Sequence, residues 1–146
     1  MKCATDALEL GIIRYGKTAR QGVAALSYLA EVYASDGGAV TSAEVGKARG
    51  MPQALAAKLL SEASSAGLVI GTTGPGGGYR LARDPAEITL ADIVWIYERK
   101  QEEPPCPFGP GWCGTGNPCP LHDGFVELER QSTEFLEGTT LAVFEG

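Results

Sequence analysis

The chain has 146 residues, of which 44% are hydrophobic, enough for one domain with a core of its own. No apolar run approaches the roughly 20 residues that a transmembrane helix needs. Residues 1–6 lack the basic-then-apolar pattern of a signal peptide, so we expect a cytoplasmic protein with no membrane partner.

The net charge is −6, which by itself argues against nucleic-acid binding, but the distribution of charge argues the other way. Residues 12–83 carry eight Lys or Arg against four Asp or Glu, whereas residues 84–146 carry three against twelve. A basic half and an acidic half indicate that the two halves have different roles. Nucleic acid is then the expected partner of the basic half. Two solvated faces of opposite sign are the alternative that charge alone leaves open.

The first part of the chain predicts a strand and a long helix. Apolar and polar residues alternate over 8–12, as in a short strand. Residues 1–13 form an N-terminal extension, in which Cys3 is expected to be a solvent-exposed thiol. From Thr18 the apolar residues follow helical spacing, and this helix is expected to end at the glycines that follow Asp36.

Two short helices come next. Thr41 and Glu44 have the spacing of a capping box, which predicts a helix that stops near Gly50. A third helix is expected to start at Pro52, because proline suits a first turn, and to end at Gly67. Two short helices joined by a tight glycine-containing turn predict a helix-turn-helix unit.

A β-hairpin is expected directly after the third helix, with strands at 68–73 and 79–83 and a turn at 74–78. Glycine-rich loops also cradle phosphates, but those loops lead into a helix and carry a Gly-Lys-Ser/Thr sequence that is absent from this stretch. Helix-turn-helix plus hairpin is the winged-helix arrangement, in which the third helix enters the DNA major groove and the hairpin lies along the backbone or minor groove. The fold class is therefore mainly α with a small β-hairpin (α+β), and residues 14–84 form a winged helix-turn-helix DNA-binding domain.

The rest of the chain predicts two further helices. Thr89 can cap a connecting helix within residues 85–103, since Asp92 follows three residues later. The buried face of that helix comprises Leu90, Ile93, Val94 and Tyr97. Residues 123–146 form a long C-terminal dimerisation helix and tail, which an antiparallel second copy would cover; packing onto its own domain is the alternative. The apolar stripe of this helix comprises Leu121, Phe125, Leu128, Ser132 and Phe135.

The segment between these two helices, residues 104–122, carries the chain's most distinctive chemistry. Its six prolines and four glycines exclude a helix or a strand. In a reducing compartment, clustered cysteines bind metal or do redox chemistry more often than they form structural disulfides. The segment therefore predicts a metal site. Its candidate ligands are Cys106, Cys113, Cys119 and the chain's only histidine, His122.

Zinc is a serious competitor for this site, because three cysteines and one histidine are a common structural zinc set. Zinc sites usually pair cysteines about two to four residues apart. The cysteine gaps here are six and five residues, which fit that spacing poorly.

These motifs resemble those of a known family. The hairpin region 74–83 reads GPGGGYRLAR, with AGLV before it at 66–69 and ITLADI after it at 88–93. Together with the cysteine segment, they resemble the bacterial winged-helix iron–sulfur transcription regulators that include IscR and NsrR. Residues 135–142 are similar to the end of the dimer helix in that family, and the resemblance covers about residues 14–143.

The resemblance implies a homodimer that binds double-stranded promoter DNA and responds, through an iron–sulfur cluster, to redox state, nitric oxide or cluster status. By motif position the three cysteines match the family's cysteine ligands, and the step to His122 is like that of the IscR-type 2Fe–2S site. NsrR-type 4Fe–4S proteins can take a carboxylate from the first helix, and the aligned residues 18–21 offer none, which favours 2Fe–2S over 4Fe–4S. Thiolates suit such clusters, and a histidine ligand raises the reduction potential.

The candidate DNA contacts fall on the first helix, the third helix and the hairpin. Gln53 and Lys58 can reach base edges, since Gln pairs with adenine and Lys with guanine. An acidic specificity residue of IscR falls on Ala57 and its wing arginine on Thr73, which implies a different operator. Phosphate contacts are expected from arginines, which position the protein without specifying sequence. The full set is Arg20, Gln53, Ala57, Lys58, Thr73, Gly76, Gly77, Arg80 and Arg83.

Two other functions stay open at the level of sequence. One is a zinc-stabilised or thiol-switch DNA-binding regulator without a cluster. The other is a redox enzyme or cluster carrier, which we rank last because the sequence has no nucleophile–base pair and no nucleotide-binding fingerprint. We therefore expect a protein that is not an enzyme.

Overall fold

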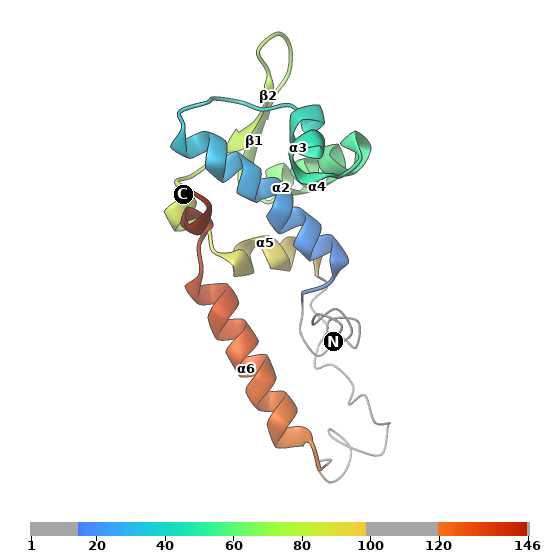
Figure 1. Cartoon of the computed structure of the whole chain (residues 1–146), viewed down its shortest axis with the longest axis vertical. Coiled ribbons are helices and arrows are strands. Elements are labelled where there is room, and N and C mark those ends of the chain that lie inside the picture. Colours follow the sequence, from blue (N-terminus) through green and yellow to red (C-terminus); the bar gives the residue numbers. More distant parts are fainter. Residues whose placement is uncertain (1–14, 99–119, 146) are drawn as a thin grey trace.

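The computed structural model describes residues 15–98 and 120–145 (Figure 1). The strand expected at residues 8–12, Cys3 and the three cysteines of the segment 104–122 lie outside the described residues. The elements are α2 (Lys17–Ala34), α3 (Ser42–Arg49), α4 (Gln53–Ser65), β1 (Val69–Thr72), β2 (Gly78–Leu81), η1 (Pro85–Glu87), α5 (Leu90–Tyr97), α6 (His122–Gly138) and η2 (Leu141–Phe144). The mainly helical fold with one antiparallel hairpin is confirmed.

The helix-turn-helix unit forms as its caps predict. The side chain of Thr41 accepts from the Glu44 amide at 3.2 Å, and the Glu44 carboxylate accepts from the Thr41 amide at 2.6 Å. The hydrogen bond from the Thr41 backbone lowers the pKa of Glu44. Helix α3 ends at Gly50, whose φ of 65° lies in the left-handed region that glycine adopts without strain. Helix α4 starts one residue later than expected, because the backbone of Pro52 is extended and caps the helix without being part of it.

The hairpin is tied to the loop between α2 and α3. Strands β1 and β2 pair in register from Val69 with Leu81 to Thr72 with Gly78, and are shorter than the strands expected at 68–73 and 79–83. Val40 and Tyr79 form a two-way backbone bridge, with N···O distances of 2.9 and 2.6 Å. The base of the hairpin is thus held in the core, while its tip extends away from the body (Figure 1).

Helix α2 is the centre of the core. It contacts α3, α4, α5, β2 and η2, and Figure 1 shows it running across the middle of the molecule. Its buried side is rich in small residues, which lets neighbouring helices approach closely. The buried residues of α2 are Ala19, Gly22, Val23, Ala25, Leu26, Ser27, Leu29 and Ala30.

Helix α6 extends away from this body (Figure 1), and among the described residues its buried contact with the body lies near its C-terminal end. Leu136 is its one buried residue among those described. Beyond α6 the chain returns to the core, where the Leu141 amide donates to the Ile88 carbonyl at 2.9 Å and the Leu90 amide donates to the Thr139 carbonyl at 2.8 Å. No helix in the described part of the chain is long and apolar enough to cross a membrane.

Arg49 fixes α3 to α2, a role that its place in the sequence does not reveal. Its Nε donates to the Ala24 carbonyl and to the Ser27 hydroxyl, each at 3.1 Å. One terminal nitrogen lies 2.6 Å from the Glu31 carboxylate, and the guanidinium sits 5.4 Å from the centre of the Tyr28 ring. This basic residue is therefore committed to contacts inside the protein.

We predict that Arg49→Met lowers the free energy of unfolding by about 2 kcal/mol, because charge-assisted hydrogen bonds across α2 and α3 are lost. Urea denaturation followed by circular dichroism measures the change. Lys47→Met, at an exposed position on the same helix, is the control and should change stability by less than about 0.5 kcal/mol. Equal stability of the two variants would contradict the assigned role.

Candidate nucleic-acid interface

One side of α4 is exposed and carries few large groups. The opposite side is buried through Ala56, Leu59, Leu60 and Ala63. The exposed positions include Gln53, Ala54 and Lys58, and Ala57 is half-buried beside them. A helix face of small residues with two long polar side chains can approach another surface closely while Gln53 and Lys58 reach beyond it.

The hairpin tip is exposed, and the geometry of its turn requires glycine at position 77. Thr73 and Gly76 are exposed, and Gly77 is half-buried. A Cβ on Gly77 would lie 2.5 Å from the Thr72 carbonyl oxygen, so a larger residue would force the turn to open. Arg80 on β2 and Arg83 after it are both exposed, which leaves their guanidinium groups available to an outside partner.

Arg20 differs from these exposed cations. It lies on α2, is half-buried, and its Nε is shielded from solvent with no hydrogen-bond partner among the described residues. Burial raises the pKa of the neighbouring Tyr15 hydroxyl, and the positive charge of Arg20 partly opposes that rise. Arg20 is therefore less accessible than Lys58 and Arg80, whose side chains are exposed.

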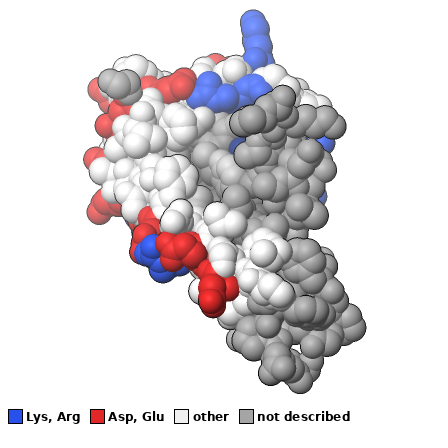
Figure 2. Space-filling view, turned by 60° about the horizontal axis from the view of Figure 1, so that its bottom comes forward, with Lys and Arg blue, Asp and Glu red and all other residues white. Residues whose placement is uncertain are grey.

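Acidic and basic side chains occupy different parts of the molecule. Figure 2 shows Lys and Arg side chains toward the upper end of the view, and Asp and Glu side chains along one edge and around the middle. Helix α6 has five acidic residues and a single basic one, Arg130. Arg130 pairs with Glu127 and Glu134, and its hydrogen bond, with a second from Gln131, lowers the pKa of Glu127 to about 2. No unpaired cation on α6 is therefore available for a polyanion.

The structure describes one of the four candidate metal ligands. Cys106, Cys113 and Cys119 lie outside the described residues. His122 is half-buried and is the first residue of α6, so it belongs to the helix and not to the segment before it. Within residues 15–98 and 120–145 there is no group of three His, Cys, Asp or Glu side chains that could hold a metal ion.

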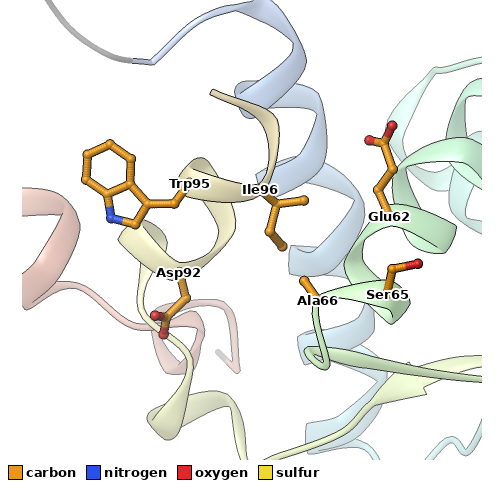
Figure 3. A pocket seen from close by; sticks show the side chains of 6 residues that line it. All are labelled: Glu62, Ser65, Ala66, Asp92, Trp95 and Ile96. Carbon is orange, nitrogen blue, oxygen red and sulfur yellow. The ribbon is translucent and has the colours of Figure 1, made fainter. Parts of the chain in front are cut away.

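An open groove of about 580 Å³ lies between the C-terminal half of α4 and α5. Figure 3 shows Glu62 and Ser65 on the α4 side, Trp95 and Asp92 on the α5 side, and Ile96 between Trp95 and α4. The carboxylates of Glu62 and Asp92 do not point toward one another (Figure 3). The groove separates the two helices over this stretch and has no converging polar groups.

Sequence reasoning missed one polar contact next to this groove. The helical spacing places Tyr97 on the buried face of α5, and its ring is indeed partly buried. Its hydroxyl, however, donates to the backbone carbonyl of Leu59 in α4 at 2.6 Å. No sequence signal could have found this bond, because the acceptor is a backbone atom of another helix.

Comparison with known proteins identifies the family. The model of the Rrf2 family, described as iron-dependent transcriptional regulator, matches residues 15–144. An HTH-type transcriptional regulator of Aquifex aeolicus is 33% identical over 129 residues, which cover 87% of this chain and 88% of that protein. The HTH-type transcriptional regulator IscR of Cronobacter sakazakii is 30% identical over 107 residues, 73% of this chain and 65% of IscR. The matched region thus spans less than two thirds of that IscR.

Two solved structures share the fold. IscR of T. potens superposes with a TM-score of 0.69 at 24% identity, covering 87% of this chain and 82% of that one. CymR of B. subtilis, described as its global cysteine regulator, superposes with a TM-score of 0.71 at 22% identity, covering 89% and 94%. The relatives from Aquifex aeolicus and Cronobacter sakazakii are transcriptional regulators by name, and the expected resemblance to winged-helix regulators is confirmed.

Proposed function

Because this chain belongs to the Rrf2 family of transcriptional regulators, we propose that it is a homodimer whose promoter binding responds to an iron–sulfur cluster. The observation that carries this proposal is the arrangement of exposed surfaces. Helix α4 and the hairpin are exposed on one body, and α6 extends from that body with Leu121, Leu128 and Phe135 exposed. The cysteine segment lies in the chain between α5 and α6, where it can link the two parts.

The proposed DNA contacts follow from exposure and side-chain chemistry. Gln53 and Lys58 extend from α4 toward base edges in the major groove, and Ala57 between them permits close approach. The hairpin follows the phosphate backbone through Arg80, and Arg83 adds a second positive charge after it. The remaining proposed contacts are Arg20, Thr73, Gly76 and Gly77.

The proposed dimer rests on α6. Leu121, Leu128 and Phe135 lie at heptad-like spacing, and their exposed fractions within one chain are 53%, 47% and 62%. Packing onto their own domain therefore leaves these side chains largely in water. Covering the remaining exposed part of each side chain favours association by about 1 kcal/mol, so a second α6 would stabilise an antiparallel pair.

The donor set fits a cluster of iron and sulfide. Cys106, Cys113 and Cys119 supply soft thiolates, and His122 at the start of α6 supplies an imidazole. When bound, a 2Fe–2S cluster supplies one-electron redox chemistry and sensitivity to oxidants and nitric oxide. Binding through His122 would hold the first turn of α6 close to the cysteine segment, and thus restrict the angle of the dimer helix.

A second candidate, a thiol-switch or zinc-stabilised regulator without a cluster, is favoured by the likeness to CymR. The similar structures include a CymR of Staphylococcus aureus solved in an oxidized form, with a TM-score of 0.66. In this version the cysteines would pair with one another or bind zinc, and DNA binding would respond to thiol oxidation.

Metal analysis and DNA titration together test the proposal. We expect protein purified without oxygen to hold about two iron and two sulfide per chain. A duplex selected from a random pool should bind the loaded and metal-free forms with different affinities at one salt concentration. His122→Ala should change the visible spectrum, whereas Asp123→Ala, the next residue, should not. Zinc without iron would favour the second candidate, and equal affinities would refute sensing.

We predict that Arg80→Met weakens binding to all duplexes alike and reduces the slope of log K against log salt by about 0.9 per protomer, because one phosphate contact is lost. Gln53→Ala should instead relax sequence preference, at a cost of about 1–3 kcal/mol for the preferred duplex. Filter binding at several salt concentrations measures both effects. Arg130→Met is the matched control, since Arg130 is paired on α6, and an equal change of slope there would count against the assigned interface.

We predict that Phe135→Glu shifts the protein from dimer to monomer in sedimentation velocity, because it places a charge in the apolar stripe of α6. Val143→Glu is the matched control, since Val143 is equally exposed at 62% but lies in η2. The proposed interface fails if Phe135→Glu stays dimeric, or if both variants dissociate to the same extent.

A further inference from the structure

The ring of Tyr97 in α5 packs directly against α2 at Gly22, a position without a side chain. Gly22 is buried in α2, and a Cβ built on it would lie 2.2 Å from Cε2 of the Tyr97 ring. Any larger residue at this position would displace the ring. Beyond α2, the Tyr97 hydroxyl donates to the Leu59 carbonyl in α4 at 2.6 Å. Gly22 thus leaves the space that the Tyr97 ring fills, and the ring in turn connects α5 to α4, the helix that carries the exposed Gln53 and Lys58.

The hydrogen bond from Tyr97 to Leu59 is an isolated link between α5 and α4. Among the described residues it is the one hydrogen bond that joins α5 to α4. On its flank the groove of about 580 Å³ separates the same two helices (Figure 3). A mid-helix carbonyl such as that of Leu59 already accepts a bond within its helix, so the hydroxyl is not needed to satisfy it. The contact instead fixes where α4 lies relative to α5.

The hydroxyl is well suited to act as a permanent donor. Burial raises the pKa of Tyr97 above its ordinary value, and the negative charge of Glu62 raises it further. The hydroxyl therefore keeps its proton, and the bond to Leu59 persists across the physiological pH range. The adjacent residue adds a second link, since the Glu98 carboxylate accepts from the Gly16 amide at 2.7 Å, just before α2.

We infer that Tyr97, with Gly22, is a positioning residue that sets the placement of α4 and thereby its discrimination between DNA sequences. The inference rests on the proposed function in one respect, that α4 reads bases. Side chains that read a ligand must be held within about 0.5 Å of their productive geometry by supporting contacts. Tyr97 is such a support, although it touches no DNA itself. Tyr97→Phe removes only the hydroxyl and so isolates the bond to Leu59.

The test uses the full chain and two probes: a duplex selected by the wild-type protein from a random pool, and a scrambled duplex of the same composition. Tyr97→Phe should lower the ratio of the two affinities about ten-fold, while binding to the scrambled duplex and its salt slope stay unchanged. Gly22→Ala, which displaces the ring, should lower the ratio as well. The double variant should lose less than the sum of the two, since both remove one contact.

Two controls separate positioning from general stability. Tyr33→Phe removes a hydroxyl from an exposed tyrosine of α2 and should leave the ratio unchanged. Ile88→Val shortens a buried side chain near Leu141 and lowers stability, but should not alter discrimination. An unchanged ratio in Tyr97→Phe, or an equal loss in Ile88→Val, overturns the inference.

Failure of the proposed function gives a different result. If the wild-type protein selects no sequence, base reading by α4 is refuted, and amide hydrogen exchange in the free protein then decides the positioning claim. Tyr97→Phe must raise exchange in α4 but not in α3 for the claim to stand. Unchanged exchange in α4 overturns it.

Discussion

The close approach of α5 to α2 at Gly22 is the constraint on which the arrangement of the molecule depends. Because Gly22 has no side chain, the Tyr97 ring fits against α2 and its hydroxyl reaches α4. The same end of α5 binds the amide of Gly16 through Glu98. The body that presents α4 is joined to α6 in two ways: α5 leads into the cysteine segment that precedes α6, and the C-terminal end of α6 packs on the core at Leu136.

The basic and acidic residues of the sequence are divided between the body that presents α4 and helix α6. Around α4 and the hairpin, Lys58 and Arg80 are exposed and have no partner within residues 15–98 and 120–145, whereas Arg49 fixes α3 to α2. On α6 the single Arg130 is held between two glutamates and its acidic neighbours would repel a polyanion. A chain of net negative charge can therefore present exposed basic side chains around α4 and the hairpin, and the proposed dimer uses the apolar stripe of α6.

The elements set by local signals were predictable from the sequence. The capping boxes at Thr41 and Thr89 form as their spacing indicates, because the interacting groups are three residues apart. The start of α4 after Pro52 differs by one residue, since a proline that caps and a proline in the first turn give the same pattern. The contact of Tyr97 with α4 was not predictable, because it depends on how α2, α4 and α5 pack. The metal ligands remain a prediction, because the three cysteines lie outside the described residues.

Taken together, the two proposals make α5 the route from the cysteine segment to α4, because α5 leads into that segment and its Tyr97 bonds to Leu59 of α4. Amide hydrogen exchange of the wild-type protein, compared between its iron–sulfur-loaded and metal-free forms, tests this most directly. The account predicts that loading changes protection at the C-terminal end of α5 and also in α4 around Leu59, while α3 stays the same. A change at α5 with identical protection of α4 in both forms would contradict it.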